Sequence, residues 1–122
     1  MDKEQSINNF WSRFGIPAYD ENSVADDVTY PFIAFSVATG KLGDTVQLYA
    51  NMYYRSTSWK DITHKKDEIA QYLGDGGKVI PLDRGYSYFC QGDPFAQRMN
   101  EPGDNMVKRY YLQLQAEFLA PY

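Results

Sequence analysis

Two long stretches of the chain, Thr45 to Arg55 and Met106 to Phe118, alternate between apolar residues and polar or aromatic residues. A period of two is typical of a β-strand that buries one face and leaves the other accessible. The apolar positions are Val46, Leu48, Ala50, Met52 and Tyr54 in the first stretch and Tyr110, Leu112, Leu114, Ala116 and Phe118 in the second. The alternation predicts a sheet with one apolar face, which other elements of the chain must cover.

Two helices are predicted to supply that cover. The first, Ser6 to Phe14, has apolar residues at helical spacing and is followed by Gly15. The second starts where Ser58 and Asp61 have the spacing of a capping box, and it ends at Gly74. The residues expected to be buried are Ile7, Phe10, Trp11 and Phe14 in the first helix and Ile62, Ile69, Ala70 and Leu73 in the second.

Three shorter strands are predicted at Tyr30 to Val37, Lys78 to Leu82 and Tyr86 to Gln91, with a hairpin loop at residues 38–44. Residues 18–29 are acidic, and residues 91–105 contain two glycines and two prolines, so both segments are expected to be exposed loops. We therefore predict an α+β fold. It is a single domain, residues 1–122, with a mainly antiparallel sheet of four to five strands and two helices packed on one face.

The charge and cysteine content exclude several classes of protein. The chain has 12 Lys and Arg against 16 Asp and Glu, a formal charge of −4, so binding of nucleic acid through its phosphates is not expected. Cys90 is the only cysteine and His64 the only histidine, so no internal disulfide and no structural zinc site is expected, and a reducing compartment is favoured. The longest mostly apolar stretch, residues 32–38, is too short to cross a membrane, and we expect a soluble protein made in the cytoplasm.

No pattern of residues predicts catalysis. His64 stands beside two lysines on the second helix, where a solvated position explains it, and Cys90 has no basic neighbour to activate it. The glycines at 74–77 precede Lys78 without the spacing or the Ser/Thr of a phosphate-binding loop. We predict no catalytic, cofactor-binding or metal-binding residue and no cofactor. A small enzyme that uses His64 or Cys90 remains an alternative.

Tyrosine and arginine residues occupy the polar positions of the two long strands: Tyr49, Tyr53, Arg55, Arg109 and Tyr111. These residue types are enriched in protein interfaces. Two interpretations stay open, because this face could contact another protein chain or could be covered by the first helix. The predicted loops add further apolar and cationic groups. The candidate protein-interaction residues are Lys41, Leu42, Tyr53, Arg55, Phe95, Arg98, Met99 and Arg109.

Several runs of residues carry a family resemblance. They are Trp11-x-x-Phe14-Gly-Ile-Pro-Ala-Tyr19, Tyr53-Tyr-Arg-Ser-Thr-Ser-Trp59, Gly76-Gly-Lys78, Pro94-Phe-Ala-Gln-Arg-Met99 and Tyr110-Tyr-x-Leu-x-Leu-x-x-Glu-Phe-Leu119. Together they resemble a small family of tailed-bacteriophage proteins, the minor capsid or tail completion proteins of long-tailed phages of Gram-positive bacteria. The resemblance covers nearly the whole chain, and it consists of ordinary residue types with no chemical signature.

The resemblance implies a non-enzymatic virion protein of the phage neck, similar to the tail terminators that join head to tail. In that class an α+β subunit forms a hexameric ring that caps the tail tube and docks onto the head connector. The implied partners are other copies of the chain, the major tail tube protein and the head connector or stopper protein. No membrane is involved, and the protein would occupy the host cytoplasm during assembly.

Genome DNA would pass through such a ring without specific binding, and an acidic wall suits this passage because it repels phosphates. The alternatives are a head-side stopper or adaptor and a cytoplasmic ligand-binding domain with tyrosine-lined walls.

Overall fold

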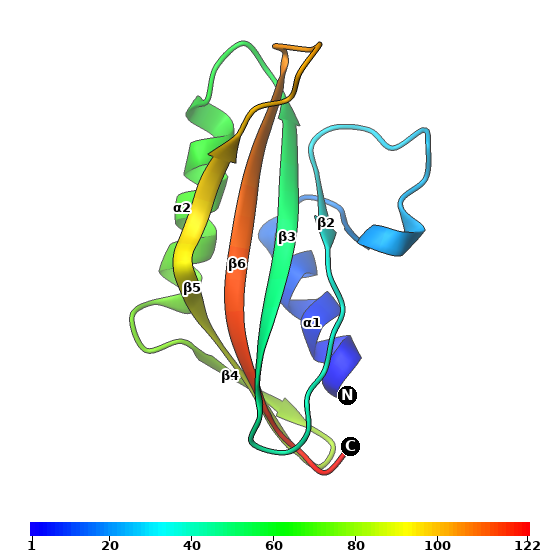
Figure 1. The fold of residues 1–122 in the computed structure, drawn as a ribbon, viewed down its shortest axis with the longest axis vertical. Helices are drawn as coiled ribbons and strands as arrows, with labels where there is room; N and C mark the ends of the chain where they lie inside the picture. Colours follow the sequence, from blue (N-terminus) through cyan, green and yellow to red (C-terminus); the bar gives the residue numbers. More distant parts are fainter.

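The computed structural model describes all residues from 1 to 122 as a curled six-stranded sheet with two α-helices (Figure 1). The elements are α1 (Lys3–Trp11), η1 (Ser12–Phe14), β1 (Ala18–Asp20), η2 (Glu21–Ser23), β2 (Phe32–Phe35), β3 (Thr45–Arg55), α2 (Lys60–Leu73), β4 (Lys78–Leu82), β5 (Gly85–Met99) and β6 (Val107–Leu119), where η marks a 3₁₀ helix. The α+β class is confirmed. The predicted four to five strands are too few, because the sheet has six in the order β1-β2-β3-β6-β5-β4.

The sheet is mixed, since β1 runs parallel to β2 while every other neighbouring pair is antiparallel. The long strand β6 lies in the middle between β3 and β5. Its pairing with β3 is unbroken from Thr45 opposite Glu117 to Arg55 opposite Val107, so the two alternating stretches of the sequence place their apolar positions on the same face.

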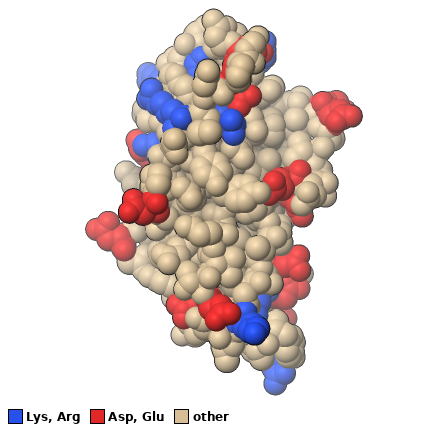
Figure 2. All heavy atoms as spheres, viewed as in Figure 1, with Lys and Arg blue, Asp and Glu red and all other residues tan.

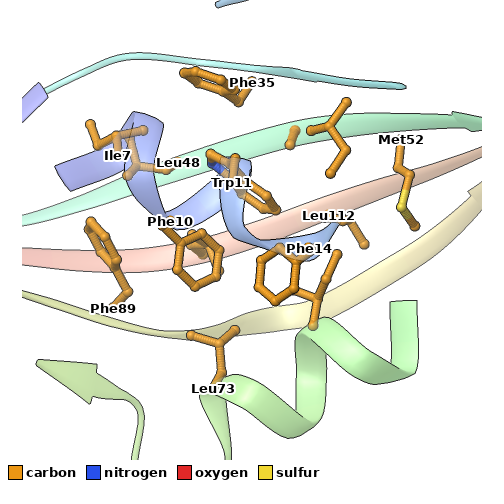
Figure 3. Packing of buried hydrophobic residues seen from close by; sticks show 14 of the residues in the cluster. Ile7, Phe10, Trp11, Phe14, Phe35, Leu48, Met52, Leu73, Phe89 and Leu112 are labelled. Atoms are coloured by element: carbon orange, nitrogen blue, oxygen red, sulfur yellow. The ribbon is translucent and has the colours of Figure 1, made fainter. Parts of the chain in front are cut away.

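Both helices pack on that apolar face, as predicted. Phe10 of α1 and Leu73 of α2 belong to one buried cluster with Leu48 of β3, Phe89 of β5 and Leu112 of β6 (Figure 3). Phe10 is at its centre, with its ring 4.9–6.0 Å from four other aromatic rings. The opposite face of the sheet is therefore not covered by the first helix, and that interpretation of the sequence was wrong.

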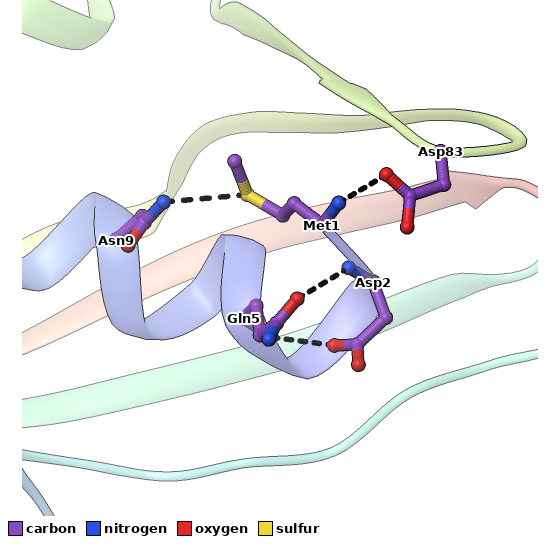
Figure 4. Close-up of polar contacts among 5 residues, drawn as sticks. All are labelled: Met1, Asp2, Gln5, Asn9 and Asp83. Atoms are coloured by element: carbon purple, nitrogen blue, oxygen red, sulfur yellow. Dashed lines mark hydrogen bonds and ion pairs between the residues drawn. The ribbon is translucent and has the colours of Figure 1, made fainter.

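Helix α1 starts earlier than predicted because residues ahead of Ser6 cap it. The Asp2 side chain accepts a hydrogen bond from the Gln5 backbone N–H at 2.8 Å, and the Gln5 side chain accepts one from the Asp2 backbone N–H at 2.9 Å (Figure 4). This reciprocal pair is a capping box. The Met1 amino group next to it forms an ion pair with Asp83 in the β4–β5 turn. The predicted end is confirmed, because Gly15 takes a left-handed conformation, with a φ of 81°.

Helix α2 begins without the predicted capping box. Trp59 occupies the N-cap position with helical backbone angles and makes no capping bond through its side chain. The Ser58 hydroxyl instead accepts from the Lys60 N–H at 3.0 Å. The remaining predictions for α2 are largely confirmed, since Ile62, Ile69 and Leu73 are buried and the helix ends at Gly74, although Ala70 is only half-buried.

The segment 91–105 was wrongly predicted as one exposed loop. β5 continues to Met99 and pairs with β6, with one irregularity in register between Gln91 and Ala96. The turn-forming residues Gly92 and Pro94 fall inside this irregularity, where a strand tolerates them. A Cβ at Gly92 would lie 2.8 Å from the Gln113 Cβ, so the close approach of β6 favours glycine there. Only residues 100–106 connect the two strands.

The segment 18–29 is also more ordered than predicted, because β1 adds a short parallel strand to the edge of the sheet. After Asp20 the chain leaves the sheet through η2 and returns at β2, forming the projection seen beside β2 in Figure 1. The β2–β3 hairpin lies at the opposite end of the sheet from the β5–β6 connection (Figure 1). Neither α-helix is long and apolar enough to span a lipid bilayer.

Candidate functional site

The face of the sheet opposite the helices carries polar and aromatic side chains from four strands. We call this surface the open face. Strand pairing assigns the following residues to it: Phe32 and Ala34 from β2, Tyr49, Asn51 and Tyr53 from β3, Arg109, Tyr111 and Gln113 from β6, and Cys90, Gln97 and Met99 from β5. Neither α-helix packs on this face, because residues of α1 and α2 both belong to the core cluster on the other side.

One row of paired residues crosses the open face: Phe32, Tyr53, Arg109 and Met99. The rings of Phe32 and Tyr53 are stacked, with centroids 4.8 Å apart and an interplanar angle of 17°. Burial against Phe32 and its neighbours raises the pKa of Tyr53. The Arg109 guanidinium donates to Asn51 Oδ1 at 2.8 Å and forms an ion pair with Glu101. The row is thus an apolar stack beside a fixed cation.

A second aromatic pair lies further along the same face. The rings of Tyr49 and Tyr111 are stacked with centroids 5.7 Å apart. The pKa of Tyr49 is raised, mainly by a hydrogen bond between its hydroxyl and Glu21 and to a smaller extent by burial. Glu21 follows β1, so the edge of the acidic projection reaches the open face at this point.

An ion pair lies at the C-terminal end of β3, at the end of the open face next to the β5–β6 connection. Arg55 Nη1 donates to Asp104 Oδ2 at 2.9 Å, and this contact connects β3 to the β5–β6 connection. The Met106 backbone N–H donates to the other oxygen of Asp104 at 2.9 Å. These two bonds hold the pKa of Asp104 below its usual range. Both side chains remain partly exposed, so a partner could still contact them.

The structure brings together four of the eight candidate interaction residues. Tyr53, Arg55, Arg109 and Met99 share the same end of the open face.

The other four candidates lie elsewhere. Arg98 points to the helix side, where its Nε donates to the Tyr110 hydroxyl at 3.1 Å. Phe95 is half-buried against the core, so its predicted place on an exposed loop was wrong. Lys41 and Leu42 are exposed in the β2–β3 hairpin, at the far end of the sheet.

Two surface grooves are the largest hollows on the molecule. The first, of about 280 Å³, lies between α1 and the β1–β2 edge, and five of the seven residues that line it are polar. The second, of about 300 Å³, lies between the start of α2 and the β5–β6 connection and is lined by Trp59, Arg98 and Lys108 among others. Binding sites for small molecules are usually enclosed and mostly apolar, and neither groove has that character.

The residues considered for catalysis do not form a site. His64 is exposed on α2, whereas Cys90 lies on the open face across the sheet. The Cys90 thiol lies 3.6 Å from the Gln115 carbonyl oxygen, to which it donates. No group of three or more His, Cys, Asp or Glu residues is arranged to hold a metal ion.

Trp59 was not among the candidate interaction residues predicted from the sequence, although it contacts two cations at the surface. Its ring contacts the Arg98 guanidinium at 4.6 Å and the Lys108 ammonium at 5.9 Å, measured to the ring centroid. The ring is half-buried against the core and lies edge-on to the Tyr110 ring at 5.6 Å, so the exposed remainder of Trp59 is what contacts the two cations.

No protein-family model matches the chain, and a search of curated proteins finds no match. The resemblance to phage neck proteins therefore stays a prediction.

Proposed function

We propose that this chain is a structural protein of the neck of a tailed phage, a tail terminator whose ring caps the tail tube and joins the tail to the head. It acts through protein contacts alone. The observation that carries this proposal is the open face, where stacked tyrosines and a fixed arginine lie on a sheet that no helix covers.

The open face has the composition of a protein interface. Tyrosine supplies a large contact area with little loss of conformational freedom, and arginine supplies several directional donors. The ring pairs and the Arg109–Asn51 hydrogen bond already hold these side chains in place, so binding a partner would cost little further ordering. A face used only for solvation would not require five aromatic or arginine side chains in two neighbouring strands.

The two ends of the sheet are suited to contacts along the axis of a tail. The β2–β3 hairpin presents Leu42, whose side chain is 61% exposed, at one end. The 100–106 connection lies at the other end, beside Arg55. The 13 residues of β6, at about 3.3 Å per residue, separate the ends by about 40 Å. One subunit could therefore meet the tail tube at one end and the head connector at the other.

The test is inactivation of the gene in a phage that encodes it, followed by electron microscopy of the particles. A tail terminator predicts tails of uncontrolled length that are not joined to heads, and adding the purified protein should restore joining. Heads that lose their DNA while tails keep their normal length would instead support the head-side stopper or adaptor. Normal particles would contradict both.

Cys90 offers a second test that requires no engineered label. It is the only cysteine, and it lies half-buried on the open face. If the open face is a contact surface, modification of Cys90 by a thiol reagent should be at least several-fold slower in assembled particles than in the free protein. An equal rate in both states would show that this part of the face stays accessible and would argue against its use.

A further inference from the structure

The negative charge of the chain is concentrated in one projection. Asp20, Glu21, Asp26 and Asp27 all lie on or next to the β1–β2 connection, and no Lys or Arg occurs between Arg13 and Lys41. These four carboxylates equal the whole formal charge of −4, so the remaining residues balance one another. None of the four takes part in an ion pair. We call residues 20–31 the acidic projection.

A cationic groove lies on the other side of the molecule, at the start of α2. Trp59, Arg98 and Lys108 line it, and Lys60 is exposed beside Trp59 as the first residue of α2; we call these four residues the Trp59 corner. Its three cations have no carboxylate partner. Arg98 and Lys108 instead lie against the Trp59 ring at 4.6 and 5.9 Å. The second groove, of about 300 Å³, runs between these side chains.

The acidic residues near the Trp59 corner do not neutralise it. Glu101 and Asp104 also line the groove, but Glu101 pairs with Arg109 and Asp104 pairs with Arg55. The pKa of the neighbouring Tyr110 hydroxyl is consistent with a net positive charge in this corner. Burial raises its pKa, yet hydrogen bonds from Arg98 and Thr63 and the charges of Arg98 and Lys66 outweigh burial, so the pKa of Tyr110 is lowered.

The two charged surfaces lie toward opposite edges of the sheet, at a similar position along the strands. A single row of paired residues runs from Ala18, two residues before the acidic projection, through Ile33, Met52 and Tyr110 to Arg98 in the Trp59 corner. The row crosses four strand spacings, about 19 Å at about 4.8 Å each. Figure 2 shows several Lys and Arg at the upper left and Asp and Glu along the right side, where Figure 1 places the acidic projection, although further Asp and Glu lie at the left edge, the top and the bottom.

We infer that the acidic projection of one copy docks into the Trp59 corner of the next copy. The two surfaces are different and lie on opposite sides of one molecule, so the contact is head-to-tail and repeats from copy to copy. A repeated contact of this kind gives a closed ring when its rotation closes. The inference rests on the proposed ring-forming function and assigns the surfaces that would build the ring.

The test changes the charge of each surface separately. Asp26→Lys/Asp27→Lys cancels the charge of the acidic projection and turns two lysines toward the cations of the Trp59 corner, whereas Lys60→Glu/Lys108→Glu makes both sides of a subunit acidic. Each variant alone should self-associate at least tenfold more weakly than the unmodified protein in sedimentation equilibrium, because like charges now face each other. An equimolar mixture of the two should recover association, since the introduced lysines of one variant then meet the introduced glutamates of the other, and the unmodified surfaces still meet each other.

Matched controls separate docking from folding and from net charge. Gln71→Lys/Asp75→Lys adds nearly the same positive charge at the exposed end of α2 and should leave association unchanged. Circular dichroism and thermal melting check that each variant folds. If Lys60→Glu/Lys108→Glu is unstable, Lys60→Glu alone replaces it, because Lys60 is exposed and has no hydrogen-bond or ion-pair partner for its side chain.

The inference is overturned if the unmodified chain stays monomeric at all concentrations, if either reversal leaves association unchanged, or if the mixture fails to recover it. Failure of the proposed function would look different. A chain that passes the charge-reversal test but leaves tails and heads normal when its gene is inactivated would keep the docking contact and lose the neck function. Conversely, if inactivating the gene gives tails of uncontrolled length but the charge-changing variants associate normally, the neck function is supported and the docking contact is not.

Discussion

Truncating one aromatic residue on each face of the sheet should separate the residues that stabilise the fold from those that are free to bind. Phe10 is fully buried and its ring contacts those of Trp11, Phe14, Tyr72 and Phe89. Replacing a buried phenylalanine with alanine costs about 3–5 kcal/mol, through lost burial and the cavity that remains. Phe10→Ala should therefore lower the free energy of unfolding by about 4 kcal/mol.

The matched variant is Tyr49→Ala on the open face. Tyr49 is half-buried, and its truncation removes one stacked cross-strand pair, with Tyr111, worth about 0.2–1 kcal/mol, together with a solvent-accessible hydrogen bond to Glu21 that adds little to stability. A chain of 122 residues has an unfolding entropy of about 0.26 kcal/mol per kelvin near its midpoint. The expected falls in Tm are thus about 15 °C for Phe10→Ala and about 4 °C or less for Tyr49→Ala.

Both variants are measured by thermal and urea denaturation, followed by circular dichroism at a concentration where the chain is monomeric. The reasoning is refuted if Phe10→Ala costs less than about 1.5 kcal/mol, which is below the range for a buried phenylalanine. It is equally refuted if Tyr49→Ala costs as much as Phe10→Ala, since the open face would then belong to the structural core.

Two further predictions concern a turn and an ion pair. Gly85→Ala should severely destabilise or unfold the chain, because Gly85 has a φ of 103° and an added Cβ would lie 1.9 Å from the Leu119 carbonyl oxygen. Gly76→Ala is the control: its added Cβ would meet nothing within 4 Å, so Tm should change by no more than a few degrees. Asp104→Asn should flatten the loss of stability in acid. The hydrogen bonds from the Met106 N–H and from Arg55 lower the folded-state pKa of Asp104, so they stabilise the protein above the ordinary value of about 4 and are lost as the pH falls below it. Urea titrations between about pH 7 and pH 2.5 check this, and equal acid slopes for the two proteins would contradict it.

The buried stripes of the elements could be predicted from the sequence, because periodicity directly reflects which face an element buries. Ile7, Phe10, Trp11 and Phe14 are all buried, and the alternation in Thr45–Arg55 has the predicted parity. The helix starts could not be predicted as well. They depend on single hydrogen bonds from capping side chains, and Asp2 rather than a residue near Ser6 makes the bond for α1.

The composition of the candidate site could be predicted, but its geometry could not. Arg98 and Met99 were grouped as neighbours on a loop, yet consecutive residues of a strand point to opposite faces, so Met99 joins the open face and Arg98 joins Trp59. The meeting of Met99 with Arg109 and Tyr53 depends on β6 lying between β3 and β5. Strand order is set by tertiary packing, which no local pattern in the sequence encodes.

The open face follows from the placement of both α-helices on one side of the sheet. Strands β3, β5 and β6 have 11, 15 and 13 residues, whereas α1 and α2 have 9 and 14, and both helices are used on the apolar face. No α-helix remains to cover the other face, and only the acidic projection reaches its edge. Tyrosine and arginine suit such a surface, because their apolar bodies pack on neighbouring strands while their polar ends stay hydrated. The same side chains can then exchange water for a partner, so such a face is compatible both with a chain that is stable alone and with the assembly that we propose.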